Sequence, residues 1–347
     1  MSAALIEKIA TQGVFQPRRN FIHLAQDHVP FDDLVGEEAY ESTALSRATE
    51  GTGMVGVVGP RGAGKSSLIA YVCSQLPETH VALRIPVTGA DDPTSVSVVA
   101  AVALSQALDD LDLEQYQREA LERPRADETA RETQPGGLRG GTLGGGPVPG
   151  AVHAELATLR EQVTTNRLAS ERLGGLDRLI TILVARRLNP VFVLEDTEAA
   201  IGGADSAKVA DAFLRGPVQA FANELDAVTL IAMQDVFKES PEFAQLTATM
   251  SLIEIPRLDT DRSRTALAAI MENRLNQHEL ESRPEQVVGD DAFELLLGFY
   301  DETDRNLRFS LAALQSAAEY ANDMRAECIR GGHMRAATSD WRDRIAG

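Results

Sequence analysis

Eight consecutive residues, Gly59 to Ser66, form the most chemically specific pattern in this chain. They read Gly-Pro-Arg-Gly-Ala-Gly-Lys-Ser, between a short apolar run and a helical run, Leu68 to Val72. Glycines in such a loop let successive backbone N–H groups turn toward a β-phosphate, and the start of the helix adds partial positive charge. Lys65 would place its ammonium between the β- and γ-phosphates, and the Ser66 hydroxyl would bind Mg²⁺. The pattern predicts a nucleoside triphosphate site.

A second candidate element is an apolar strand, Asn189 to Leu194, that ends in Glu195 and Asp196. Chemistry on a bound triphosphate needs two such acids. One holds the Mg²⁺ shell, and the other orients or deprotonates the attacking water. Taken alone, the pattern also fits a strand that ends in solvated acids. Its place in the same chain as the phosphate loop favours the catalytic interpretation.

Composition limits the classes of function. The 347 residues include 33 basic and 52 acidic side chains, a net charge of −19, which argues against a broadly basic surface for nucleic acid. The two cysteines lie far apart, so they indicate neither a zinc site nor a disulfide framework. No stretch reaches the ~18 apolar residues of a membrane span. The first 16 residues lack the apolar core of a signal peptide, and we expect a cytoplasmic protein without membrane contact.

Strands and helices alternate through the first two thirds of the chain. Five apolar runs predict strands at 54–58, 81–86, 190–194, 227–233 and 251–255, and the helical patterns between them favour a parallel sheet covered on both faces. Residues 114–150 are charged and then glycine-rich, which predicts a flexible insertion. Residues 154–188 predict one or two helices, broken near Gly174-Gly175.

After Pro256 the pattern becomes purely helical. Helices are expected at 262–276, 290–300 and 306–324, with Asp304 or Asn306 as the N-cap of the last. We therefore predict four segments: an N-terminal extension (1–30), an α/β nucleotide-binding domain (31–256), a helical lid domain (257–330) and a tail (331–347).

The residues also resemble a family. Phe31 to Glu38 is similar to the segment that packs against adenine in AAA+ ATPases, where an apolar pair and a glycine line the base pocket. The phosphate loop, the acidic strand end, a fourth strand and a helical C-terminal part follow in AAA+ order over residues 20–325. The layout is most similar to the initiator and transposition-regulator ATPases. The resemblance implies ATP and Mg²⁺ as ligands, a five-stranded parallel sheet in the order 5-1-4-3-2, and a helical lid.

The resemblance also assigns residues. The base would contact Leu34, Val35 and Gly36. The triphosphate would contact the Walker A element, which comprises Gly59, Pro60, Arg61, Gly62, Ala63, Gly64, Lys65, Ser66 and Ser67. Ser66 and Glu195 would hold the metal. The family usually has Asp and then Glu where this chain has Glu195 and then Asp196, so the pair is inverted and slow hydrolysis is expected.

Two further residues match the nucleotide sensors of the family. Gln234 follows the fourth strand at the sensor-1 position, and Arg308 matches sensor 2, with Arg305 as the alternative. A surface role for either residue remains open. No arginine occurs between Gln234 and Ser251, where AAA+ rings usually carry an arginine finger; Arg215 or Arg257 could serve instead.

The predicted function is an ATP-hydrolysing switch that couples nucleotide state to lid movement and to assembly with further copies or a partner protein. The process would be linked to DNA, through transposition, replication or phage defence, although the net charge does not favour DNA binding. The alternative is a weakly hydrolysing scaffold subunit, and a P-loop kinase is disfavoured by the adenine-pocket segment. The histidines, His28 included, are expected to be structural. The tail from Arg330 to Arg344, with Trp341, is mildly basic and could touch nucleic acid or dock a partner.

Overall fold

The α/β part of the molecule is built on one parallel sheet. The computed structural model describes residues 3–18, 20–35, 39–50, 52–122, 150–197, 206–258 and 260–346. Every strand pair in the sheet is parallel, and the order is β2-β3-β4-β1-β5, which confirms the predicted order. The strands are β1 (Gly53–Val58), β2 (His80–Pro86), β3 (Asn189–Glu195), β4 (Val228–Met233) and β5 (Met250–Glu254).

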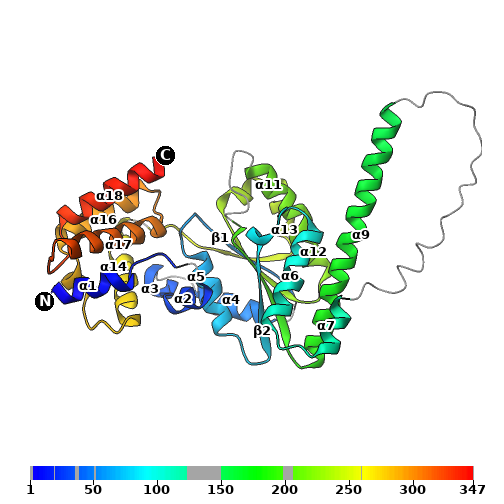
Figure 1. Cartoon of the computed structure of the whole chain (residues 1–347), viewed down its shortest axis with the longest axis horizontal. Coiled ribbons are helices and arrows are strands. Elements are labelled where there is room, and N and C mark those ends of the chain that lie inside the picture. The colour runs from blue at the N-terminus through cyan, green and yellow to red at the C-terminus, as the bar shows by residue number, and fades with distance from the viewer. Residues whose placement is uncertain are drawn as a thin grey trace, which may run out of the picture.

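Helices cover both faces of this sheet (Figure 1). Alternate residues of each strand point to opposite faces, so β1 places Val55 in one hydrophobic cluster and Val58 in the other. On the first face lie α4 (Tyr40–Thr49) and α5 (Lys65–Ser74). The second face is covered by α6 (Val96–Asp110), α9 (Gly150–Ala185), α11 (Ser206–Phe213), α12 (Gln219–Glu224) and α13 (Pro241–Leu246).

Two predictions around the insertion need correction. Helix α7 (Gln115–Glu122) occupies the start of the segment expected to be flexible, while residues 123–149 lie outside the described residues. Helix α9 also runs without a break through Gly174-Gly175. A Cβ on Gly175 would lie 2.8 Å from Leu104 Cδ1, so this glycine permits the close approach of α9 to α6 and does not break the helix.

The C-terminal part is all helical, as predicted. It contains α14 (Thr260–Gln277), α15 (Pro284–Val287), α16 (Asp290–Glu302), α17 (Leu307–Asp323) and α18 (Gly331–Ala346). Asn306 is the N-cap of α17, because its side chain accepts a hydrogen bond from the Arg308 N–H. The predicted tail forms α18, which packs on α16 and α17. No helix in the described ranges combines the length and apolar character needed to cross a bilayer.

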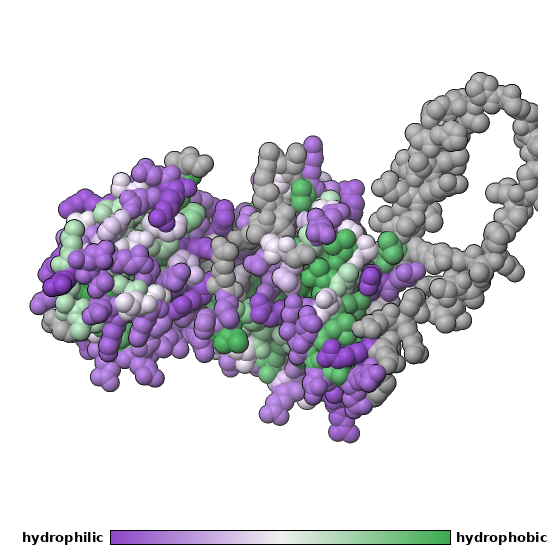
Figure 2. All heavy atoms as spheres, viewed as in Figure 1, coloured by the Kyte–Doolittle hydropathy of each residue, from purple (hydrophilic) through white to green (hydrophobic). Residues whose placement is uncertain are grey.

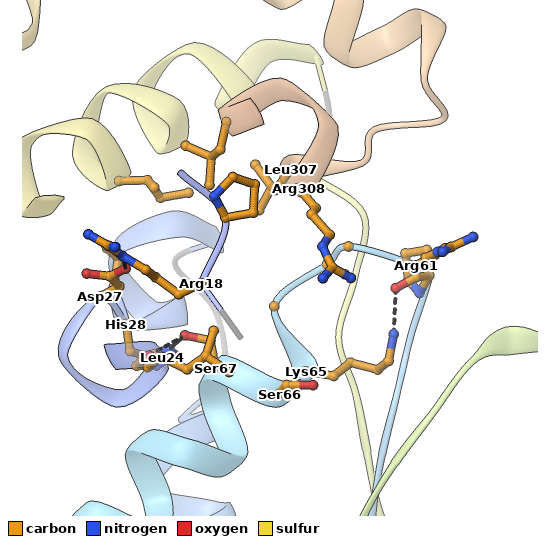
Figure 3. A pocket seen from close by; sticks show the side chains of 18 of the residues that line it. Arg18, Leu24, Asp27, His28, Arg61, Lys65, Ser66, Ser67, Leu307 and Arg308 are labelled. Carbon is orange, nitrogen blue, oxygen red and sulfur yellow. Dashed lines mark hydrogen bonds and ion pairs between the residues drawn. The ribbon is translucent and has the colours of Figure 1, made fainter. Parts of the chain in front are cut away.

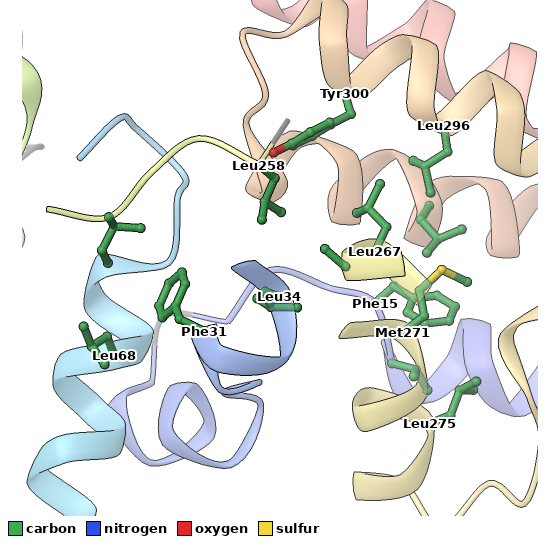
Figure 4. Packing of buried hydrophobic residues seen from close by; sticks show 14 of the residues in the cluster. Phe15, Phe31, Leu34, Leu68, Leu258, Leu267, Met271, Leu275, Leu296 and Tyr300 are labelled. Atoms are coloured by element: carbon green, nitrogen blue, oxygen red, sulfur yellow. The ribbon is translucent and has the colours of Figure 1, made fainter. Parts of the chain in front are cut away.

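The first 30 residues connect the two parts. Helix α1 (Ala3–Gln12) packs on α17 of the lid, whereas α2 (Phe21–Gln26) packs on α5 of the α/β part, and α3 (Phe31–Val35) follows. Figure 4 shows the continuous apolar cluster that results, from Leu68 and Phe31 on the α/β side to Met271 and Phe15 on the lid side. In the view of Figure 2 the lid surface is mainly hydrophilic, and hydrophobic side chains gather around α6.

Candidate nucleotide-binding site

The phosphate loop joins β1 to α5 in the conformation that its glycines permit. Gly62 has a φ of +76° and Gly64, directly before α5, has a φ of +96°, both in the left-handed region. Gly59 serves close packing instead, because a Cβ there would lie 2.8 Å from the Ile255 carbonyl oxygen. The loop therefore folds tightly over the ends of β1 and β5, with the N-terminus of α5 at its rim.

Lys65 is buried beneath this loop, with 3% of its surface exposed. Its ammonium donates hydrogen bonds to the carbonyl oxygens of Pro60 (2.7 Å) and Gly59 (3.1 Å). Ser66, the next residue, is exposed and lines the cavity (Figure 3). A buried cation and a hydroxyl at the start of a helix are groups that bind a phosphate chain and its metal.

The cavity above the loop has a volume of about 560 Å³, which suits a nucleotide-sized ligand. One wall is the α/β part, with the phosphate loop, Glu195 and Asp196. The other is the lid, through α14 and α17, together with residues 17–31 of the N-terminal segment. The site is thus shared between three segments that are distant in sequence.

Glu195 ends β3 and is held by a residue that the sequence analysis did not identify. Arg84 of β2 donates from Nε to Oε1 (2.8 Å) and from Nη2 to Oε2 (2.7 Å), a bidentate pair. The hydrogen bonds to Glu195 raise the pKa of Arg84 above its ordinary value. The Phe21 ring lies 4.4 Å from the same guanidinium. The only sequence signal was one arginine in an otherwise apolar strand.

Asp196 lies directly after β3 with a φ of +56°, an uncommon conformation for a residue with a side chain. The next residue, Thr197, is fully buried and its hydroxyl donates to the Ala232 carbonyl oxygen of β4, which anchors this turn. Asp196, Glu195 and Ser66 all line the cavity, and they present the oxygen ligands that Mg²⁺ takes in proteins. Within the described ranges no cluster of three or more acidic, His or Cys residues is arranged to hold a metal. A magnesium ion here would therefore need phosphate oxygens and water as further ligands.

The two predicted sensors differ in position. Gln234 directly follows β4. Its neighbour Met233 accepts a hydrogen bond from the Gly59 N–H, which brings this strand end next to the phosphate loop, but Gln234 does not line the cavity. Arg308, in the first turn of α17, does line it, as does Arg305. Figure 3 shows the Arg308 side chain directed toward the phosphate loop.

The lid touches the loop directly. A Cβ on Gly62 would overlap the side-chain amide of Asn306, so α17 begins in contact with the phosphate loop. Arg257 also lines the cavity of its own chain and forms an ion pair with Asp304. Arg215 instead pairs with Asp211 (3.0 Å) and Glu242 (2.9 Å) and does not line the cavity.

The opposite end of the cavity, where a base would lie, contains charged groups that the sequence analysis missed. Arg274 of α14 is 5% exposed and pairs with Asp27 (Nη2–Oδ2, 3.3 Å) while it donates to the Gln16 carbonyl oxygen (2.9 Å). Burial lowers the pKa of Arg274, and the Asp27 charge opposes that shift. Leu34 lines the cavity as predicted; the Val35 side chain and Gly36 lie outside the described residues.

His28 connects this end to α5. Its Nε2 lies 2.9 Å from Glu41 Oε1 and its Nδ1 lies 3.2 Å from Ser67 Oγ. The Ser67 hydroxyl donates to the Leu24 carbonyl oxygen (3.0 Å), so it bonds to the N-terminal segment, and its contact with nucleotide stays a prediction. Burial acts to raise the pKa of Glu41, but hydrogen bonds from His28 and the Phe31 N–H outweigh it and leave that pKa lowered.

Solved structures of ORC and Cdc6 proteins have a fold similar to that of this chain. ORC1 of Aeropyrum pernix, solved in complex with DNA, matches with a TM-score of 0.53 and 15% identity over 94% of this chain and 71% of that chain. ORC2 of the same organism, in ADPNP-ADP complexes, matches at 0.52 and 16% identity over 94% and 71%. Cdc6p of Pyrobaculum aerophilum matches at 0.50 and 14% identity over 95% and 70%.

Sequence comparisons gave no further assignment. No protein-family model matches the chain, and no curated protein matches it. The structural neighbours support the fold that the AAA+ resemblance implies, and the likeness to initiator and transposition-regulator ATPases stays a prediction. The chain has the fold of the AAA+ proteins of the ORC/Cdc6 type, a parallel five-stranded sheet followed by a helical domain.

Proposed function

We propose that this chain binds Mg·ATP between its α/β part and its lid, and hydrolyses it slowly as a nucleotide-dependent switch. The observation that carries the proposal is one cavity in which the phosphate loop, two acids and an arginine of the lid all meet. The solved ORC2 complexes with ADPNP and ADP support a nucleotide ligand for this fold.

Each residue has a chemical task in this scheme. Lys65 neutralises charge on the β- and γ-phosphates, and backbone N–H groups of residues 60–65 bind their oxygens. Ser66 and Glu195 would hold Mg²⁺, which when bound neutralises phosphate charge. Asp196 orients the attacking water and accepts its proton. Arg308 contacts the γ-phosphate, so loss of that phosphate removes one contact between the lid and the ligand.

The output is proposed to be assembly with further copies or a partner protein, in a process linked to DNA such as replication. The ORC1 neighbour, solved with DNA, is the support for the DNA link. Arg257 lines its own chain's cavity, and Arg215 is engaged in an ion-pair network. Neither arrangement favours an arginine supplied to a neighbouring copy, so a switch is favoured over a fast ring motor.

A second candidate function is a nucleotide-binding scaffold that barely hydrolyses ATP. The bidentate pair between Arg84 and Glu195 favours it, because it engages both oxygens of the acid proposed to hold the metal. The inverted order of Glu195 and Asp196 also favours the scaffold, because it is expected to slow hydrolysis.

Phosphate release by the wild type and by Asp196→Ala separates the two functions. The switch predicts measurable turnover that falls about a hundredfold or more in the variant, the typical cost of losing a general base. The scaffold predicts fewer than about one turnover per hour in both proteins, far below the ~10 per second of a median enzyme, with ATP retained. ATP binding is measured in parallel as a control for folding.

A further inference from the structure

A second cavity, of about 950 Å³, lies next to the nucleotide cavity. Its walls are the N-terminal segment between Ala10 and His23 and the lid helices α17 and α18. Arg18, Arg61 and Arg308 line both cavities. The second cavity therefore adjoins the phosphate loop, and these three arginines lie between the two cavities.

The lining of this second cavity is strongly basic, although the whole chain carries a net charge of −19. Arg344 of α18 joins the three shared arginines, so four different segments contribute one guanidinium each. Among the described residues that line it, Glu319 is the single acid, and it accepts a hydrogen bond from Gln315 (3.2 Å). Arg18 is paired with Asp27 (Nε–Oδ2, 3.8 Å) and lies beside His278. Arg61, Arg308 and Arg344, in contrast, line one concave site, where their charge concentrates positive potential and suits phosphate groups.

Aromatic side chains form part of the same lining. The Trp341 and Phe309 rings lie with centroids 6.2 Å apart, and the Arg344 guanidinium lies 5.1 Å from the Trp341 ring. The indole N–H of Trp341 is 3.2 Å from Ser316 Oγ, which fixes the ring against α17. Phosphate-binding arginines beside aromatic rings are the combination with which proteins bind single-stranded nucleic acid.

Buried hydrogen bonds make the base of this cavity rigid. Gln315 is 6% exposed; its Oε1 accepts from the Phe15 N–H (3.0 Å) and its Nε2 donates to the Ala10 carbonyl oxygen (3.1 Å). These bonds join the N-terminal segment to α17. The site is thus built before any ligand arrives, which lowers the entropic cost of binding.

We infer that this second cavity binds a short stretch of single-stranded nucleic acid, with its phosphates on Arg61, Arg308 and Arg344 and a base against the aromatic pair. A duplex fits less well, because its bases are stacked inside and a concave site of this size cannot contain its width. An acidic peptide would use the arginines but not the rings. The inference deepens the function proposed above, since it assigns a place to nucleic acid in that process.

The shared arginines couple the two cavities. Any ligand that draws Arg61 or Arg308 toward one cavity changes the potential in the other. ATP is therefore expected to change the affinity for the strand, and the strand must change the affinity for ATP by the same factor.

The single tryptophan of the chain reports directly on this site. Trp341 fluorescence of the full chain is titrated with oligothymidylate. We expect saturable quenching that weakens as salt rises.

Arg344→Gln should reduce the affinity for oligothymidylate at least about fivefold, because one phosphate contact is lost. The affinity for ATP should stay unchanged, because Arg344 does not line the nucleotide cavity. Arg335→Gln, an exposed arginine of α18 outside the cavity, is the matched control.

A second variant works in the opposite direction, so a loss of folding cannot imitate it. Glu319→Gln removes the single acid and keeps a hydrogen-bond acceptor, and should raise the affinity about twofold to threefold. Equal losses in Arg344→Gln and Arg335→Gln would overturn the inference, as would quenching by polyglutamate and not by oligothymidylate. If ATP binding fails while the strand still quenches Trp341, the nucleotide proposal is wrong and this one stands.

Discussion

The floor and the roof of the nucleotide cavity share apolar packing but differ in their other contacts. The floor, residues 59–67 with Glu195 and Asp196, rests on the sheet, where β4 is buried along its whole length. The roof, residues 14–29 with α14 and α17, is also packed into a hydrophobic cluster, through side chains such as Phe15 and Met271, and it adds charged contacts such as Arg274–Asp27. The floor is stabilised by the backbone bonds of the sheet and by apolar contacts, whereas the roof combines apolar contacts between helices with charged pairs, some of them exposed.

This difference indicates a division of tasks. A loop fixed by the sheet presents its backbone donors at low cost, so most of the affinity should come from the floor. Exposed charged pairs contribute only about 0–1 kcal/mol each and rearrange easily. The roof can therefore respond to the nucleotide, and the buried Arg274–Asp27 pair is expected to be its least adaptable contact.

The largest effect is expected for Lys65→Ala in the floor. Loss of the buried ammonium should weaken ATP binding at least about a hundredfold, equivalent to ~2.7 kcal/mol, because it removes a charge-assisted contact in a site of low dielectric. Isothermal titration calorimetry measures it. Lys238→Ala is the control: this lysine is paired with Asp235 (3.6 Å) and Glu254 (3.2 Å) and does not line the cavity. Equal affinities in all three proteins would refute the assignment of the floor.

The next effect concerns the buried pair of the roof. Arg274→Met leaves Asp27 without its main partner and should destabilise the protein by about 3 kcal/mol, the usual cost of breaking a buried ion pair. Chemical denaturation gives the change. Arg264 lies on α14 like Arg274, but its pair with Glu294 of α16 is exposed. Arg264→Met should therefore cost less than about 1 kcal/mol. A comparable loss of unfolding free energy in both variants would show that the buried Arg274–Asp27 pair stabilises the roof no more than an exposed pair does.

A smaller effect is expected at the boundary of floor and roof. Arg84→Gln releases Glu195 from its bidentate partner, so the carboxylate can approach a metal more easily. The Mg²⁺ concentration that half-saturates ATP binding should fall about threefold, a change below 1 kcal/mol. Calorimetry at several Mg²⁺ concentrations measures it, with Arg47→Gln as the control, since Arg47 pairs with Glu50 on the surface. An unchanged Mg²⁺ requirement would mean that Glu195 does not act on the metal.

The smallest effect depends on pH. Hydrogen bonds from His28 and the Phe31 N–H lower the pKa of Glu41 in the folded protein despite its burial. A lowered folded pKa contributes stability above the unfolded pKa, and that contribution is lost as pH falls through the folded value. The wild type should therefore be more stable than Glu41→Gln at neutral pH, and the difference should shrink below the ordinary carboxyl range. Glu50→Gln, at an exposed site, should show no such trend in thermal melts; a constant gap for Glu41→Gln would contradict the reasoning.

What the sequence predicted was local. The phosphate loop, the acidic strand end and the N-cap, expected at Asp304 or Asn306, each depend on neighbours within a few residues; the structure contains the first two where expected and selects Asn306 as the cap. The strand order was also predicted, but from the resemblance to AAA+ proteins. Gly174-Gly175 misled the prediction because a glycine that admits a neighbouring helix has the same sequence signature as one that ends a helix.

What the sequence could not supply were contacts between distant segments. Arg84 meets Glu195 across 111 residues, and Arg274 meets Gln16 across 258. A single sequence carries no signal for such pairs. The roof was therefore predicted only as a helical lid, without the N-terminal segment that completes it.

Hydrogen exchange with and without Mg·ATP tests whether the nucleotide binds between the sheet and the lid, because it reports on floor and roof in one experiment. We expect added protection in residues 59–67 and, in the same sample, at the start of α17 around Arg308, with both changes lost in Lys65→Ala. Protection in the loop alone would separate the lid from the nucleotide, and no change in either segment would contradict the proposed site altogether.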